Sequence, residues 1–133
     1  MVGMQPALDM IGIVAADVAA SLAFYRRLGV PFPDGADDQP HVEATLPGGL
    51  RIALDSVEVI RSFQPDWAPP SGGARVALAF LCDGATGVDA TYAELVAAGA
   101  PGRVAPFDAP WGQRYARVAD PDGNDVDLFA RLP

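Results

Sequence analysis

Two segments of this chain, 70 positions apart, repeat the same order of an apolar run followed by an amphipathic helical pattern. Four positions correspond between them: Val18, Leu22, Tyr25 and Gly29 match Val88, Tyr92, Leu95 and Gly99. In each set the first three residues form one apolar stripe at helical spacing, and the glycine can end the helix in a left-handed conformation. A repeat of this length indicates a duplicated module, so the fold must be one that two copies of a single unit build together.

Strand-like segments surround both predicted helices. Apolar runs precede the helices at residues 8–16 and 75–83, and Asp17 is placed to cap the first helix. Three further segments follow each helix: residues 41–47, 50–56 and 57–63 in the first half, and 103–107, 112–120 and 124–132 in the second. Each half therefore predicts a βαβββ order.

The two halves are expected to form one α+β domain over residues 1–133. The first module spans 7–63, the second spans 74–132, and residues 64–73 form a linker rich in Pro and Gly. One helix can cover only one face of a sheet of this size, so neither half is complete alone. We expect two sheets, each covered outside by its helix, to curve around a shared cavity as one mixed sheet. Their open edges also predict a homodimer.

Charge and cysteine content exclude several partners. Nine basic residues against 17 acidic ones give a net charge of −8, so a nucleic acid or an anionic membrane would repel the chain. No apolar stretch approaches the roughly 18 residues of a membrane span. The N-terminus lacks a basic region and is interrupted by Asp9 and Asp17, and the single Cys82 cannot form an intramolecular disulfide. We therefore expect a cytoplasmic protein.

Two segments carry a family resemblance that covers nearly the whole chain. One runs from Asp17 to Gly29, with its Phe24-Tyr25 and Leu28-Gly29 pairs; the other joins Trp111-Gly112 and Arg114 to the turn Asp120–Asn124. In these features the sequence resembles the vicinal oxygen chelate superfamily of glyoxalase, bleomycin-resistance and extradiol-dioxygenase-like proteins. The resemblance implies paired βαβββ modules. It also implies either a divalent metal that acts on vicinal oxygens or a metal-free cavity that holds a drug.

The resemblance also indicates where metal ligands belong, and most are missing. The family's first-strand ligand, usually His or Gln, falls on Met10 in the first module and on Val76 in the second. The family carboxylate falls on Asp127, and the remaining ligand has His41 and Glu43 as candidates. Met and Val side chains do not bind hard cations, so we expect no metal cofactor. If there is a divalent metal, His41, Glu43 and Asp127 are its ligands.

Strand alternation assigns side chains to the cavity. Val126, Leu128 and Ala130 should pack under a helix, which turns the residues between them inward, and the same argument applies to Met10 and Arg51 on earlier strands. Two tryptophans lie outside core periodicity: Trp67 covers either the cavity or a partner subunit, and Trp111 either packs in its turn or contacts ligand. Arg114 either pairs with a nearby acid or contacts ligand. The predicted ligand-binding residues are Met10, Glu43, Arg51, Trp67, Trp111, Arg114, Asp125, Asp127 and Phe129.

The sequence favours a binding protein over an enzyme. It contains no G-x-S-x-G motif and no Gly-rich phosphate loop. No Ser or Cys stands at a spacing from the only His that would indicate a nucleophile and its base. We expect metal-free binding of a small cationic or aromatic molecule, with drug sequestration as the concrete form. The alternative is a lyase, isomerase or dioxygenase that uses the metal ligands named above, or acid–base chemistry by a buried carboxylate. A third possibility is a module that regulates a protein partner through Trp67.

Overall fold

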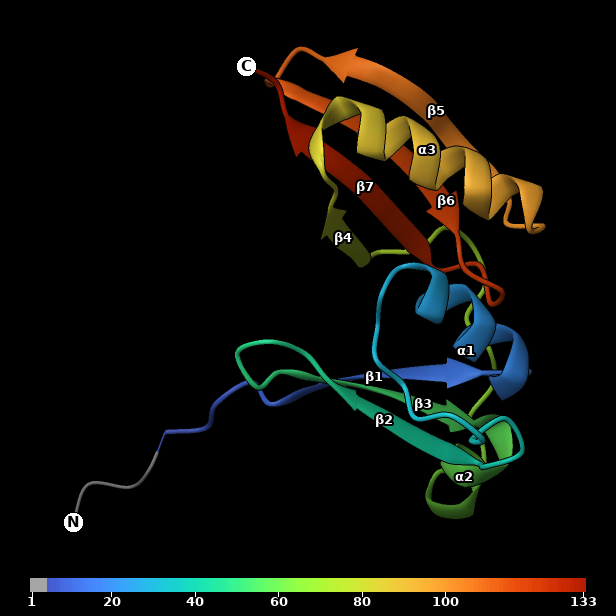
Figure 1. Ribbon diagram of the computed structural model, residues 1–133. Coiled ribbons are helices and arrows are strands. Elements are labelled where there is room, and N and C mark those ends of the chain that lie inside the picture. The colour runs from blue at the N-terminus through green and yellow to red at the C-terminus, as the bar shows by residue number, and fades with distance from the viewer. Residues whose placement is uncertain (1–4) are drawn as a thin grey trace.

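A computed structural model describes residues 5–133 as seven strands and three helices (Figure 1). The elements follow in the order β1 (Met10–Ala15), α1 (Val18–Arg27), β2 (His41–Thr45), β3 (Arg51–Ser56), α2 (Val57–Phe63), β4 (Ala77–Leu81), α3 (Gly84–Ala97), β5 (Gly102–Ala109), β6 (Gln113–Ala119) and β7 (Asp125–Arg131). This is an α+β fold with mixed sheets, as the sequence predicts. Within the described residues no helix is long and apolar enough to cross a membrane.

The first module is a three-stranded sheet, here called sheet A, in the order β1-β3-β2. β1 runs parallel to β3, and β2 runs antiparallel to it. Leu22 and Tyr25 of α1 are fully buried, as are Leu54 and Ala15 on the strands beneath. The apolar stripe predicted for this helix is therefore its core face, and it covers one face of sheet A.

The second module is a four-stranded sheet, here called sheet B, in the order β4-β7-β6-β5. Helix α3 covers one face, where Val126, Leu128 and Ala130 are at most 2% exposed. This confirms the predicted alternation of β7. The opposite face has no helix on it (Figure 1).

The predicted strand at residues 57–63 is wrong, because this segment is helix α2. Its Val and Ile residues fit either a strand or a short helix. The Ser56 side chain accepts a hydrogen bond from the Val59 amide at 3.2 Å. This bond caps the first turn of a helix and so favours the helix over a strand. The first module therefore has three strands instead of four. Residues 30–40, which join α1 to β2, contain three prolines that cannot donate hydrogen bonds to a ladder.

The C-terminal glycines of α1 and α3 agree with the predicted repeat, but the N-terminal caps differ, because Asp83 makes no capping hydrogen bond where Asp17 does. Asp17 accepts a hydrogen bond from the Ala20 amide at 3.1 Å, and Arg26 and Arg27 occupy the last turn of α1. Gly29 and Gly99 lie just beyond α1 and α3 with φ of 84° and 105°, a region that favours glycine. Both helices therefore end at a glycine with positive φ, as the sequence predicts.

The modules meet through α1 and the turn between β6 and β7. The buried Tyr25 hydroxyl donates to Asp120 at 2.6 Å, and the Asp122 carboxylate accepts from the Ala16 amide at 2.9 Å. β1 and β4 are both edge strands, and no ladder joins them. The two modules therefore form two mixed sheets rather than one hydrogen-bonded sheet, within the α+β fold that the sequence predicts. The sheets are separate, and a cavity lies between them.

Candidate functional site

A cavity of about 560 Å³ lies between the two modules, a volume typical of small-molecule sites. We call it the inter-module cavity. Its walls come from β1, the start of α2, the linker, β4 and the turn before β7. The lining residues are Ile11, Gly12, Ile13, Val14, Ala16, Tyr25, Val57, Trp67, Pro69, Pro70, Val76, Leu78, Asp122, Asn124 and Asp125. Most of this wall is apolar.

The polar part of the wall carries negative charge. It consists of Asp122, Asn124 and Asp125, and no described lining residue is basic. Asp122 accepts from the Ala16 amide and, at 3.4 Å, from the Ser21 hydroxyl, but neither group brings a positive charge. Partial burial raises the pKa of the Asp122 carboxyl above its usual value. A ligand with a positive charge or strong hydrogen-bond donors would stabilise the charged carboxylates in this part of the cavity wall.

Trp67 forms the main aromatic part of the wall, and α2 fixes its backbone. The Trp67 amide donates to the Gln64 carbonyl at 3.0 Å, and the Arg61 Nε donates to the Trp67 carbonyl at 3.1 Å. Pro69 and Pro70 continue the wall from Trp67. The linker predicted from its composition thus contributes one side of the cavity.

Asp125 and Asp127 are paired with a residue that the sequence reasoning missed. Arg117 on β6 donates to Asp127 at 2.6 and 3.2 Å and to Asp125 at 3.2 Å. These hydrogen bonds raise the pKa of the guanidinium, chiefly through Asp127. Arg117 and Asp127 each lie five residues from Asp122, and equidistant positions face each other across this hairpin. That spacing is the signal that could have found the pair.

The uncovered face of sheet B carries an aromatic cluster beside this ion pair. Phe107, Trp111 and Tyr115 meet edge to face, with ring centroids 5.5–6.1 Å apart. Phe129 lies opposite Tyr115 in the β6–β7 register, on the same face as Asp127. Trp111 stays 59% exposed and donates to the Gln113 side chain at 3.0 Å. These predicted residues share one face, but only Asp125 of them also lines the inter-module cavity.

The face of sheet A opposite to α1 holds a polar network. His41 lies between two carboxylates, with Nδ1 2.5 Å from Asp55 and Nε2 2.7 Å from Glu43. Arg51 donates to Glu43 at 2.7 Å and also bonds to Asp9. Met10 lies on the same side of the sheet, opposite Arg51 in the register. Glu43, Arg51 and Met10 are therefore together, but none of them lines the inter-module cavity.

Arg114 lies on the face of sheet B that α3 covers, whereas Asp125, Asp127 and Phe129 lie on the opposite face. It is opposite Ala130, whose side chain is buried under α3. Its guanidinium donates to Asp89 of α3 at 2.9 Å and to Asp108 at 3.1 Å. Pairing with nearby acids, one of the two roles considered for Arg114, is the arrangement in the structure.

The donor groups present do not fit the metal site that the fold implies. His41 and Glu43 are on sheet A and Asp127 is on sheet B, and within residues 5–133 no three His, Cys, Asp or Glu side chains gather as a metal cluster. Both His41 nitrogens face carboxylates, and Arg117 holds Asp127. Met10 and Val76 offer no suitable donor for a hard cation.

The imidazole of His41 should titrate above its ordinary pKa of about 6.5. The hydrogen bond that the ring donates to Asp55, together with the one it donates to Glu43, raises the pKa of His41 because both favour the charged ring. The resulting stabilisation is present below the unfolded-state pKa and is lost as pH rises through the folded-state value. NMR titration of tag-free protein measures this directly, because the chain has one His. Asp55→Asn should lower the measured pKa; an unchanged value would contradict the pairing.

Comparison with models of protein families gives a match that covers most of the chain. The model of the "Glyoxalase/Bleomycin resistance protein/Dioxygenase superfamily" matches residues 7–128. None of the curated proteins matches the chain.

Solved structures of this kind share the fold. A glyoxalase/bleomycin resistance protein/dioxygenase family enzyme from Burkholderia phytofirmans is similar with a TM-score of 0.81 and 23% identity, over 96% of this chain and 100% of the other. A glyoxalase-related enzyme from Fulvimarina pelagi gives 0.78 and 24%, over 96% and 89%. A glyoxalase/bleomycin resistance protein/dioxygenase from Nocardioides gives 0.74 and 26%, over 98% and 87%.

Proposed function

Since the chain belongs to the glyoxalase/bleomycin resistance protein/dioxygenase superfamily, we propose that it is a metal-free binding protein for a small aromatic molecule with a positive charge. The observation that carries this proposal is the composition of the inter-module cavity. Its wall combines an indole, prolines and aliphatic side chains with two carboxylates and, among the described residues, no basic group. Such a wall excludes anions and favours a cation with a large apolar body.

Each part of the wall has a separate role in the proposed complex. Trp67 offers a flat aromatic surface, on which a cationic ring gains both apolar contact and attraction to the π-face. Asp122 attracts the positive charge, because no described cation neutralises its carboxylate. Asp125 adds less, since Arg117 already offsets its charge.

Binding alone would serve the proposed role of drug sequestration. A bound molecule is withdrawn from its target, and no bond needs to break. Met10 and Val76 stand where the resemblance expects metal ligands, and among residues 5–133 no three His, Cys, Asp or Glu side chains gather as a metal site; both support this form over a metal-dependent lyase, isomerase or dioxygenase.

Thermal-shift measurements test the proposal with matched aromatic compounds that differ only in charge. A ligand that binds the folded state raises the free energy of unfolding by RT ln(1 + [L]/Kd), and the melting temperature rises with it. Cationic members of each set should stabilise the protein more than the neutral and anionic members. Equal responses across the charge series would remove the argument from Asp122 and Asp125.

We also propose that two copies associate through the uncovered sheet faces. On sheet A, Met10 of β1 is exposed; on sheet B, Leu81 at the end of β4, Phe107 on β5 and Trp111 in the turn after β5 are exposed. Val76, just before β4, is exposed as well. β1 and β4 are sheet edges with unpaired backbone groups. A second copy would cover both the apolar side chains and the edges.

Leu81→Asp should weaken this association at least about tenfold, because it places a charge in an apolar contact. Leu81 is 61% exposed, so the monomer itself should tolerate the change. Val96→Asp is the matched control, since Val96 is 39% exposed on α3, which packs against the other face of sheet B. Light scattering after size exclusion gives the result. A wild-type mass of one 13.8 kDa chain at all concentrations would contradict the proposed dimer.

A further inference from the structure

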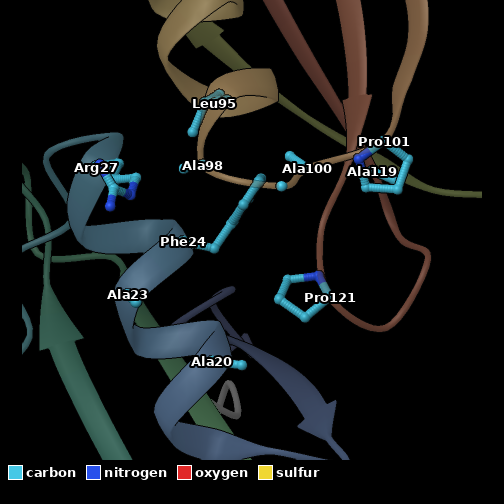
Figure 2. A pocket seen from close by; sticks show the side chains of 11 residues that line it. Ala20, Ala23, Phe24, Arg27, Leu95, Ala98, Ala100, Pro101, Ala119 and Pro121 are labelled. Atoms are coloured by element: carbon cyan, nitrogen blue, oxygen red, sulfur yellow. The ribbon is translucent and has the colours of Figure 1, made fainter.

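A second cavity, of about 300 Å³, lies between α1 and the end of α3 and shares no lining residue with the inter-module cavity. We call it the α1–α3 cavity. One wall is the α1 face formed by Ala20, Ala23, Phe24 and Arg27, which recur at helical spacing. The opposite wall is the end of α3 with residues 98–100. Figure 2 shows Phe24 extending from α1 toward Ala100 across this space.

The cavity is apolar except for one charged group. Among the residues that the structure describes, Arg27 is the only one in the lining with a formal charge, and alanine, glycine, proline, leucine and phenylalanine make up the rest. Its charge is opposite in sign to that of the inter-module cavity, whose lining within residues 5–133 contains carboxylates and no base. The two cavities therefore select ligands of opposite charge.

Arg27 is held more loosely than other paired arginines. It approaches Glu94 at 3.5 Å, and the two side chains are 46% and 55% exposed. Arg114 and Arg117 bind their acids at 2.9 and 2.6 Å. A guanidinium binds a carboxylate best at about 2.7–2.9 Å with two parallel hydrogen bonds. A ligand carboxylate can therefore make a better bond to Arg27 than Glu94 does.

We propose that the α1–α3 cavity binds a small monocarboxylate with an apolar body. The carboxylate pairs with Arg27 at the mouth, and the body fills the space between Phe24 and residues 98–100. Such a ligand touches both modules at once, because α1 belongs to the first and α3 to the second. Its binding therefore strengthens the module contact. The site does not depend on the function proposed for the inter-module cavity.

NMR titration with benzoate tests this proposal on the full chain. We expect saturable shifts of the amides of Ala98, Gly99 and Ala100, and affinity about tenfold weaker for benzamide, which has the same shape without the charge. Arg27→Gln should weaken benzoate binding by a similar factor, and Arg27→Lys should weaken it less. Arg131→Gln removes the same charge on β7, outside this lining, and should change nothing.

Three results would overturn the proposal. They are the absence of saturable shifts at these amides, equal affinity for benzoate and benzamide, and benzoate binding that Arg27→Gln leaves unchanged. Benzylammonium serves as the opposite control, because it should shift amides around Trp67 and Asp122 instead. Loss of that second response would contradict the function proposed for the inter-module cavity and leave the benzoate result intact.

Discussion

Replacing Asp120 with alanine is expected to lower the free energy of unfolding by about 3–5 kcal/mol, a large part of the stability of a domain of this size. Asp120 is 2% exposed. Its carboxylate accepts from the Tyr25 hydroxyl at 2.6 Å, from the amides of Asp122 and Asn124 at 2.9 Å each, and from the Asn124 side chain at 2.8 Å. The substitution leaves all of these donors without their acceptor, and it removes a hydrogen bond between the two modules.

Tyr25→Phe should cost less, about 1–3 kcal/mol, because it removes only one of the four hydrogen bonds. The Tyr25 ring itself stays fully buried in the core. Since the two residues contact each other, the double substitution should cost less than the sum of the single ones. Urea denaturation followed by circular dichroism measures all three variants. A loss below about 1 kcal/mol for Asp120→Ala would show that the contact between the modules rests on other groups.

Trp67→Ala is expected to weaken binding of a cationic aromatic ligand about 30- to 100-fold. The indole supplies the largest aromatic surface of the inter-module cavity. Loss of its apolar contact and of its attraction for a cation corresponds to about 2–3 kcal/mol. Stability should change little, because Trp67 belongs to the segment between α2 and β4 and lies outside the buried core.

Two variants separate this effect from a general loss of aromatic surface. Trp67→Phe keeps an aromatic face and should retain most of the affinity. Trp111→Ala removes an equally large side chain that does not line the inter-module cavity, and affinity should be unchanged. Isothermal titration calorimetry gives the three dissociation constants. A larger loss for Trp111→Ala than for Trp67→Ala would move the site to the aromatic cluster on sheet B.

Most of the fold follows from local sequence patterns. Helices α1 and α3 were predictable because their apolar stripes and terminal glycines repeat, and β7 because Val126, Leu128 and Ala130 occupy every second position and form one apolar face. Helix α2 was not, because seven residues rich in Val and Ile fit either periodicity, and the helix is favoured by a single hydrogen bond that the Val59 amide donates to the Ser56 side chain.

The candidate site was less predictable, because it depends on how the modules meet. The hydrogen bond from Tyr25 to Asp120 joins residues 95 positions apart, and no local pattern gives that geometry. Strand alternation correctly put Asp125 and Asp127 on one face, but it did not indicate the Arg117 guanidinium beside them. For Trp67 the sequence predicted a position over the cavity or over a partner subunit, and in the structure Trp67 lines the inter-module cavity.

Calorimetric titration of one cationic aromatic ligand, before and after the protein is dialysed against EDTA, tests the central proposal most directly. The ligand should be one that the thermal-shift series identifies. We expect one bound molecule per inter-module cavity and the same dissociation constant in both preparations, because the proposed contacts come from Trp67, Asp122 and the apolar wall. Binding that disappears after EDTA treatment, and returns on addition of Zn²⁺ or Mn²⁺, would contradict a metal-free site.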